Sequence, residues 1–298
     1  MRVLSRNVNE RGPQSLTASV VVGGFVMGEG PRWHEGRFWF SDIFDGHVYS
    51  VGDDGELHLE VTIDRPSGLG WLPDGSLLIA TLARTVNGQL AGPARVVRVD
   101  GTGQHIVIDV TDEGNIGFND MVVGPDGLAY VNVYRGISAR EDEIWLVRPD
   151  GSHECVASEL AHPNGMVITP DRRTLLACET HAHRVLAFSI DADGMLSGQR
   201  VFADGLAIAD GLCLDAEGAV WVGNLFAGEF LRVEEGGTIT HRVAAPPGQW
   251  ALAPMLGGLE RRTLFVLTAD TDPERAQADD ARGFLSRVEV EVPGAGWP

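Results

Sequence analysis

The 298-residue chain has little cysteine, little positive charge and no long apolar run. Its three cysteines, Cys155, Cys178 and Cys213, show no metal-like spacing, so we expect reduced thiols in a cytoplasmic protein. The 23 Lys and Arg residues are outnumbered by 42 Asp and Glu residues, and the net charge of −19 argues against nucleic acid or an anionic membrane as partner. No window approaches the roughly 20 apolar residues of a membrane-spanning helix, and MRVLSRNVNERGPQ at the start lacks an export signal core.

Two common catalytic motifs are also missing. No G-x-S-x-G sequence occurs, which argues against a serine hydrolase of the nucleophile-elbow type. Gly101 and Gly103 follow an apolar stretch, but neither a third glycine nor a helical pattern comes after them. The fingerprint of a dinucleotide-binding fold is therefore absent.

What the chain does have is an internal repeat. One design recurs six times: a short loop, an apolar stretch, a polar turn and a second apolar stretch, with the turns 39 to 52 residues apart. Such a period is typical of solenoids and propellers, and short Val-, Leu-, Phe- and Trp-rich stretches joined by Pro-Asp-Gly turns are typical of β-hairpins. The sequence predicts an all-β, six-bladed β-propeller with four-stranded blades, a single domain over residues 1–298, closed by SVVVGG (residues 19–24) as an outer strand of the last blade.

The repeat also predicts a site, because the first strand of each blade lines the central channel of a propeller. Equivalent residues near the starts of these strands are Glu29, Ser67, Asn119, Asn164, Asp210 and Ala253. Four converging oxygen donors suit a hard divalent cation, so the predicted metal ligands are Glu29, Asn119, Asn164 and Asp210. Ca²⁺ is the first expectation, with Zn²⁺, Mn²⁺, Mg²⁺ and Fe²⁺ as alternatives. Ser67 is expected to bond to backbone groups instead.

Each ligand also has a simpler interpretation. Asn-Asp, Asn-Gly and Asp-Gly are common turn dipeptides, so any one of these residues taken alone is better explained as part of a turn. Their recurrence at one structural position, together with Glu29, favours a shared metal site over four separate turns.

Four short motifs around these residues resemble the SMP-30/gluconolactonase/luciferin-regenerating family of six-bladed propellers, over nearly the whole chain. The motifs are Gly28-Glu29-Gly30-Pro31 with Trp33, Phe118-Asn119-Asp120, Pro163-Asn164-Gly165, and Asp210-Gly211 followed by Leu214-Asp215-Ala216-Glu217-Gly218. The resemblance implies that the matching Glu, Asn and Asp bind a divalent metal, that Asn119 completes or borders the site, and that Asp210 is the general base of a lactone hydrolase. Sugar-lactone members often have Arg before the F-N-D motif; Gly117 stands there in this chain, which favours a less polar lactone or ester.

The predicted function is therefore a divalent-metal-dependent hydrolase that opens a lactone or related ester, a small-molecule substrate. The cation would polarise the carbonyl, and water activated either by the ion or by Asp210 would attack it. Two alternatives stay open: a metal-dependent aryl-ester or phosphotriester hydrolase, and a non-catalytic propeller that binds a ligand or protein at the same mouth. The expected assembly is a monomer or a small homo-oligomer.

Residues at the metal-side mouth are the candidates for binding substrate. They are Asn119, Gly117, His162 and Tyr134. Loops between the second and third strands of a blade share this face, and we expect specificity to come from residues 82–94, 134–142 and 269–283, the last an acidic segment interpreted as a mobile flap or a solvated excursion. Phe226 and Trp250 could add apolar walls, whereas His181 and His183 are expected to be solvated or hydrogen-bonded.

Overall fold

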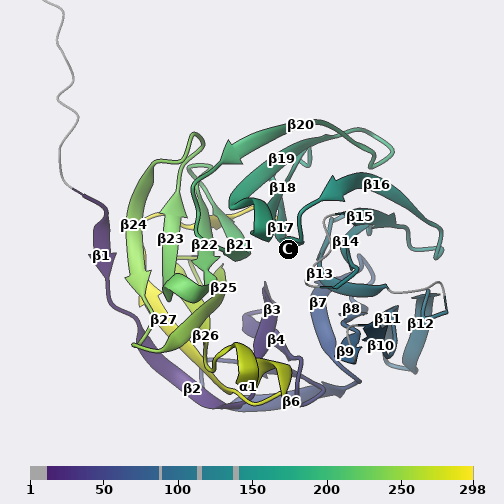
Figure 1. Ribbon diagram of the computed structural model, residues 1–298, viewed down its shortest axis with the longest axis horizontal. Helices are drawn as coiled ribbons and strands as arrows, with labels where there is room; N and C mark the ends of the chain where they lie inside the picture. The colour runs from purple at the N-terminus through teal and green to yellow at the C-terminus, as the bar shows by residue number, and fades with distance from the viewer. Residues whose placement is uncertain (1–11, 87–88, 113–115, 137–140, 298) are drawn as a thin grey trace, which may run out of the picture.

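The computed structural model describes residues 12–86, 89–112, 116–136 and 141–297. Six β-sheet blades stand around a central axis, and successive blades follow one another along the chain (Figure 1). The predicted all-β, six-bladed propeller is confirmed, and each blade contains one of the six repeat units. Residues 1–11, from which the absence of an export signal was argued, and residues 137–140 of one predicted specificity loop lie outside the described residues.

The first three blades run from the inner strand outwards as follows. Blade 1 contains β3 (Gly28–His34), β4 (Arg37–Asp42), β5 (His47–Val51) and β6 (Leu57–Thr62). Blade 2 contains β7 (Pro66–Trp71), β8 (Leu77–Thr81), β11 (Arg95–Asp100) and β12 (Gly103–Asp109), with a small hairpin of β9 (Arg84–Val86) and β10 (Gln89–Ala91). Blade 3 contains β13 (Gly117–Val123), β14 (Ala129–Tyr134), β15 (Asp142–Val147) and β16 (His153–Leu160).

The last three blades contain short helices as well. Blade 4 contains β17 (Pro163–Ile168), β18 (Thr174–Glu179), the 3₁₀ helix η1 (Thr180–Ala182), β19 (Arg184–Ile190) and β20 (Leu196–Ala203). Blade 5 contains β21 (Ala209–Asp215), β22 (Val220–Asn224), η2 (Leu225–Ala227), β23 (Glu229–Val233) and β24 (Ile239–Ala244). Blade 6 contains β25 (Gln249–Gly257), β26 (Thr263–Asp270), α1 (Pro273–Gln277), β27 (Arg282–Glu289) and, as its outer strand, β2 (Ser19–Phe25).

Both ends of the chain close the ring. The predicted closure is confirmed, because β2 pairs with β27, and β1 (Gln14–Leu16) adds in parallel to β24 of the neighbouring blade. At the other end, β28 (Gly294–Ala295) pairs with the last residues of β21, and Trp297 bridges to Ile168 at the end of β17. The C-terminal segment therefore crosses from blade 5 to blade 4 beneath the inner strands, near the centre of the ring in Figure 1.

The turns that define the repeat form for local reasons. In the Pro-Asp-Gly turns, Gly75 and Gly127 have φ of +85° and +81°, a left-handed conformation that glycine adopts without steric cost. The side chain of the aspartate before each glycine accepts a hydrogen bond from the backbone amide of the residue that follows the glycine. Each turn thus joins the first two strands of a blade with its polar groups satisfied.

Stability comes from apolar packing between neighbouring sheets. Each of the larger clusters of buried side chains combines residues from adjacent blades, such as Phe118 with Leu78, or Val167 with Leu212. A propeller buries both faces of every blade in this way, which is why its strands read as nearly continuous apolar stretches. Within the described part of the chain, no helix has the length and apolar character needed to span a bilayer.

Candidate metal centre and active site

Every inner strand carries an irregularity near its start. The pairing of the first strand with the second skips two residues in each blade, at positions that include Ser67, Asn119, Asn164 and Asp210. Such a bulge redirects side chains out of the regular pleat. In blade 6 the equivalent residue is Leu252, not the predicted Ala253, and in blade 1 Glu29 is the last paired residue before the skip. The pairing of the first two strands decides which residue occupies the skipped position. A fixed count of residues back from the turn is therefore wrong by one residue in blades 1 and 6.

Four of these side chains form a hydrogen-bonded arc across four neighbouring blades. Ser67 Oγ donates to Asn119 Oδ1 at 3.1 Å, and Asn119 Nδ2 donates to Asn164 Oδ1 at 3.4 Å. Asn164 Nδ2 in turn donates to Asp210 Oδ1 at 2.5 Å. The structure therefore brings Asn119, Asn164 and Asp210 together, and Ser67 bonds to a side chain and not, as expected, to the backbone.

Glu29 completes the group electrostatically. Burial, and then the charges of Asp210 and Asp120, raise the pKa of Glu29 well above its usual value, although the Gly30 amide partly offsets this. Burial, and then the charge of Asp120, raise the pKa of Asp210 to about 8, against the opposing hydrogen bond from Asn164. Two neighbouring carboxyl groups whose ionisation is made unfavourable by burial and nearby negative charge form a site that a cation would stabilise.

A buried ion pair, which the sequence analysis did not predict, lies beside this group. Arg32 Nη2 is 2.9 Å from Asp120 Oδ1, and both residues are buried. The guanidinium also donates to the carbonyls of Leu69, Pro31 and Met121. Arg32 thus pairs with Asp120, whereas Glu29 and Asp210 have no ion-pair partner among the described residues. The available signal was an arginine on an otherwise buried inner strand, where charge needs a partner.

Polar side chains on the second strands of the blades donate hydrogen bonds to backbone carbonyls of the inner strands. Asn132 Nδ2 donates to the Asn164 carbonyl at 2.6 Å, and Ser41 Oγ donates to the Ser67 carbonyl at 2.7 Å. Cys178, on the second strand of blade 4, is buried, and its burial and the charges of Asp210 and Asp120 raise the pKa of its thiol well above the usual value. The thiol therefore stays protonated beside the carboxylates.

The residues present fit a hard divalent cation. Four blades contribute two carboxyl groups, Glu29 and Asp210, and two carboxamides, Asn119 and Asn164, to one group of interacting side chains, and all four carry oxygen donors of the kind that Ca²⁺ and similar ions take. Across the described ranges no group of three or more His, Cys, Asp or Glu side chains is placed to hold a metal ion. The fit therefore depends on Asn119 and Asn164 as neutral ligands beside the two acidic side chains.

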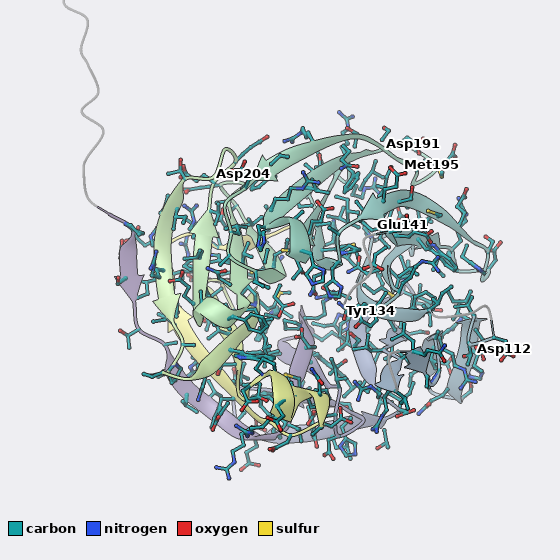
Figure 2. The ribbon with its side chains drawn as sticks, viewed as in Figure 1. Asp112, Tyr134, Glu141, Asp191, Met195 and Asp204 are labelled. Carbon is teal, nitrogen blue, oxygen red and sulfur yellow. The ribbon has the colours of Figure 1, made fainter. Side chains whose placement is uncertain are left out.

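The predicted substrate residues lie at the mouth where the inner strands begin. Tyr134 ends β14 and lies close to the central axis in Figure 2. Its ring meets the ring of His162 edge-on at 5.2 Å, and His162 stacks on His181 at 4.8 Å. Gly117 is buried, and a Cβ there would lie 3.0 Å from the backbone nitrogen of Ala83. An arginine at position 117 thus requires the chain at Ala83 to shift.

Two further features rim the same mouth. Phe226 and Trp250 pack edge-to-face at 4.8 Å, and Phe226 is 56% exposed. The acidic excursion of blade 6 (residues 269–283), which contains α1, lies over blade 1 in Figure 1. Asp279 connects it to blade 2 by ion pairs. This carboxylate pairs with Arg65 at 3.0 Å and with Arg84 at 3.2 Å, so the excursion is anchored to blade 2. A cavity of about 400 Å³ lies elsewhere, lined by turn residues that include Asp126 and Arg172.

Residues 27–270 match the model of the SMP-30/gluconolactonase/LRE-like region, and the chain belongs to this family. The range spans all six inner strands. It also contains Glu29, Asn119, Asn164 and Asp210, which together are called the oxygen ring below.

Relatives of known name are similar along most of their length. A pentonolactonase, XacC, from Haloferax volcanii is 26% identical over 285 residues, which is 90% of this chain and 92% of the relative. A 6-deoxy-6-sulfogluconolactonase from Pseudomonas putida is 24% identical, over 92% of this chain and 94% of the relative. Among solved structures, the calcium-binding protein regucalcin from Agrobacterium tumefaciens superposes with a TM-score of 0.78 at 21% identity, over 96% of this chain and 98% of that one. This last likeness concerns the fold.

Proposed function

We propose that the protein is a lactone hydrolase that depends on a divalent cation held by Glu29, Asn119, Asn164 and Asp210. The observation that carries this proposal is the hydrogen-bonded arc from Asn119 through Asn164 to Asp210, beside the coupled carboxyl of Glu29. Membership of the family and two relatives named as lactonases support a lactone as the substrate. The all-oxygen donor set makes Ca²⁺ the first ion to test.

The role of each residue follows from its place in the ring. When bound, the ion would supply Lewis-acid polarisation of the lactone carbonyl. Asp210, whose Oδ1 already accepts a hydrogen bond from Asn164, holds the carboxylate that takes a proton from the attacking water. Asn164 is fixed on both sides, because its side chain bonds to Asp210 and its carbonyl accepts from Asn132. The Cys178 thiol stays protonated and does not compete as a nucleophile.

A second function has support from one feature of the mouth. The exposed Phe226 beside Trp250 is an apolar rim that a non-catalytic binding propeller would also use. The oxygen ring favours the hydrolase, because four convergent polar side chains in a channel are costly unless they hold a ligand. The same ring is compatible with an aryl-ester or phosphotriester substrate, which the substrate panel below includes.

The proposal is tested by assaying purified protein against unsubstituted lactones, sugar lactones, aryl esters and phosphotriesters in the presence of Ca²⁺, Mn²⁺, Zn²⁺ or Mg²⁺. We expect lactone opening, and we expect Asp210→Asn to lower kcat by roughly a hundredfold, the scale for a positioned general base. The matched control is Asp204→Asn, because Asp204 is exposed and lies on the outer rim in Figure 2. Lactone opening by Asp210→Asn at the rate of the control would contradict the role of Asp210, and no turnover of any substrate would favour the binding propeller.

A further inference from the structure

We propose that His162 determines substrate specificity at the channel mouth by accepting a hydrogen bond from a hydroxyl group of the lactone, and that buried Asp142 positions its imidazole for this. The inference rests on the proposed lactone hydrolysis and names the class of lactone: one that carries a ring hydroxyl. His162 lies two residues before Asn164 in the chain, immediately before the inner strand β17. Its side chain is 15% exposed, so part of the ring reaches solvent at the mouth.

Two buried polar atoms without partners carry the argument. His162 Nδ1 and Asp142 Oδ2 lie 3.6 Å apart, and neither has a hydrogen-bond partner among the described residues. The side chain of Asp142 is fully buried, and its other oxygen already accepts a hydrogen bond from the Arg135 amide at 3.0 Å. A buried polar atom without a partner is unfavourable, so two such atoms that face each other form a natural pair. A small rotation of the imidazole closes the gap.

This pairing fixes which ring nitrogen carries the proton. An ionised carboxylate only accepts hydrogen bonds, so Nδ1 must be the donor toward Asp142. In the neutral ring Nε2 is then an acceptor. Nε2 lies on the side of the ring away from Nδ1, and Nδ1 faces the buried carboxylate. The ring therefore offers an acceptor, and its natural complement is a hydroxyl donor on the substrate.

The surroundings hold the ring in place. The rings of Tyr134 and His181 contact His162 from blade 3 and from η1, edge-on and stacked respectively. The backbone of His162 is in the left-handed region, with φ of +62°, a conformation that non-glycine residues rarely adopt. His162 thus supplies, from blade 4, a polar contact at a mouth where Gly117 offers no side chain.

The test compares three lactones that differ at one ring carbon, which carries a hydrogen, a hydroxyl or a methoxy group. Wild-type protein should prefer the hydroxy to the methoxy lactone by at least roughly tenfold in kcat/KM, because a methoxy group cannot donate to Nε2. His162→Phe keeps the aromatic packing and should remove most of this preference, mainly through KM. His162→Asn, which suits the left-handed backbone, should do the same and guards against misfolding of the phenylalanine variant.

Asp142→Asn gives the sharper result. Its side-chain oxygen can still accept from the Arg135 amide, which turns the new NH₂ group toward Nδ1 and moves the imidazole proton to Nε2. Nε2 then donates, so the variant should gain activity on the methoxy lactone relative to the unsubstituted one, whereas His162→Phe should not. Nitrogen-15 NMR of histidine-labelled protein at pH 8 should show the proton on Nδ1 in the wild type and on Nε2 in Asp142→Asn.

The matched control is His153→Phe, an exposed histidine that stacks on Trp145 at 5.2 Å, and it should leave the hydroxy-to-methoxy ratio unchanged. An unchanged ratio in both His162 variants, or a proton on Nε2 in the wild type, would overturn the inference while lactone hydrolysis itself stands. If no lactone is hydrolysed, the proposed function fails, and the same comparison is read from dissociation constants of the three lactones.

Discussion

At the scale of single residues, the site is defined by which charges have partners. Asp120 pairs with Arg32, whereas Glu29 and Asp210 have no ion-pair partner among the described residues, and burial is the largest cause of the raised pKa of both carboxyl groups. Alignment of the six repeats located Asn164 and Asp210 at the skipped pairing positions of their inner strands and Glu29 one residue before the skip. It did not predict the pair between Arg32 and Asp120, because the two residues are 88 positions apart and meet only when blades 1 and 3 close on the axis.

The first prediction separates a ligand from a proton acceptor. Glu29→Gln should weaken binding of the divalent cation, and excess ion should recover part of the activity. Asp210→Asn should keep the ion, since Glu29 and two amides remain, but excess ion should not restore kcat. Metal content and activity are measured on both variants over one ion titration. Equal rescue of the two variants would show that Asp210 is a ligand without a role as base.

A second prediction concerns the buried ion pair. Arg32→Met leaves Asp120 as a buried charge without its partner and removes the three backbone contacts of the guanidinium. We expect the free energy of unfolding to fall by about 3–5 kcal/mol, the usual cost of breaking such a pair from one side. Urea denaturation measures it, and a change below about 1 kcal/mol, typical of an exposed pair, would contradict the account.

At the scale of elements, bulges and caps place the functional side chains. The bulge at the start of each inner strand arises from pairing with the second strand, and the sequence shows it only indirectly, as an Asn or Asp in an apolar stretch. The acidic excursion of blade 6 was expected to be a mobile flap or a solvated excursion. Most residues between Asp272 and Asp280 are exposed, in keeping with the second alternative, and the segment contains α1, capped by Asp272, with Arg275 paired to Asp270 and Asp280. Its anchor, Asp279, reaches arginines of blade 2, a contact that no local pattern predicts.

The third prediction tests this anchor. Asp279→Ala removes both ion pairs to blade 2, and of their partners Arg65 is largely buried and Arg84 is exposed. The excursion should detach more often while the ring stays folded, so hydrogen exchange in residues 271–281 should speed up severalfold. The matched control is Asp280→Ala, which breaks only the exposed pair with Arg275 and leaves the contacts to blade 2. Equal exchange in both variants would contradict an anchor at Asp279.

At the scale of the molecule, six similar sheets bring distant segments to one axis. The period of the repeat and its hairpin turns were enough to predict the ring, its blade count and its closure by residues 19–24. The crossing of β28 and Trp297 beneath the inner strands was not predicted, since two paired residues and one bridge leave no periodic pattern. The six-bladed ring also sets the electrostatics, because alternate blades 1, 3 and 5 bring Glu29, Asp120 and Asp210 close enough for their charges to interact.

A fourth prediction follows for stability. Without the ion, the raised pKa values of Glu29 and Asp210 mean that the folded protein holds protons that the unfolded chain has released. The free energy of unfolding should therefore fall as the pH rises from about 4 towards 8. At one fixed concentration, a divalent ion should stabilise the protein more at pH 8 than at pH 5, and a concentration of 100 times its Kd at pH 8 should add about 2.7 kcal/mol there and raise Tm. Thermal melts at pH 5 and pH 8 measure this, and a stabilisation by the ion that does not grow with pH would contradict it.

The central claim is that one divalent cation in the four-blade oxygen ring supports lactone hydrolysis. Its most direct test is a single titration in which chelated protein is returned stepwise to Ca²⁺, and bound metal and lactone-opening rate are measured on the same samples. The account predicts no activity at zero metal and a rate that rises in proportion to bound ion up to one per chain. Full activity in protein whose metal content is zero, or saturation of the site without any lactone opening, would contradict it.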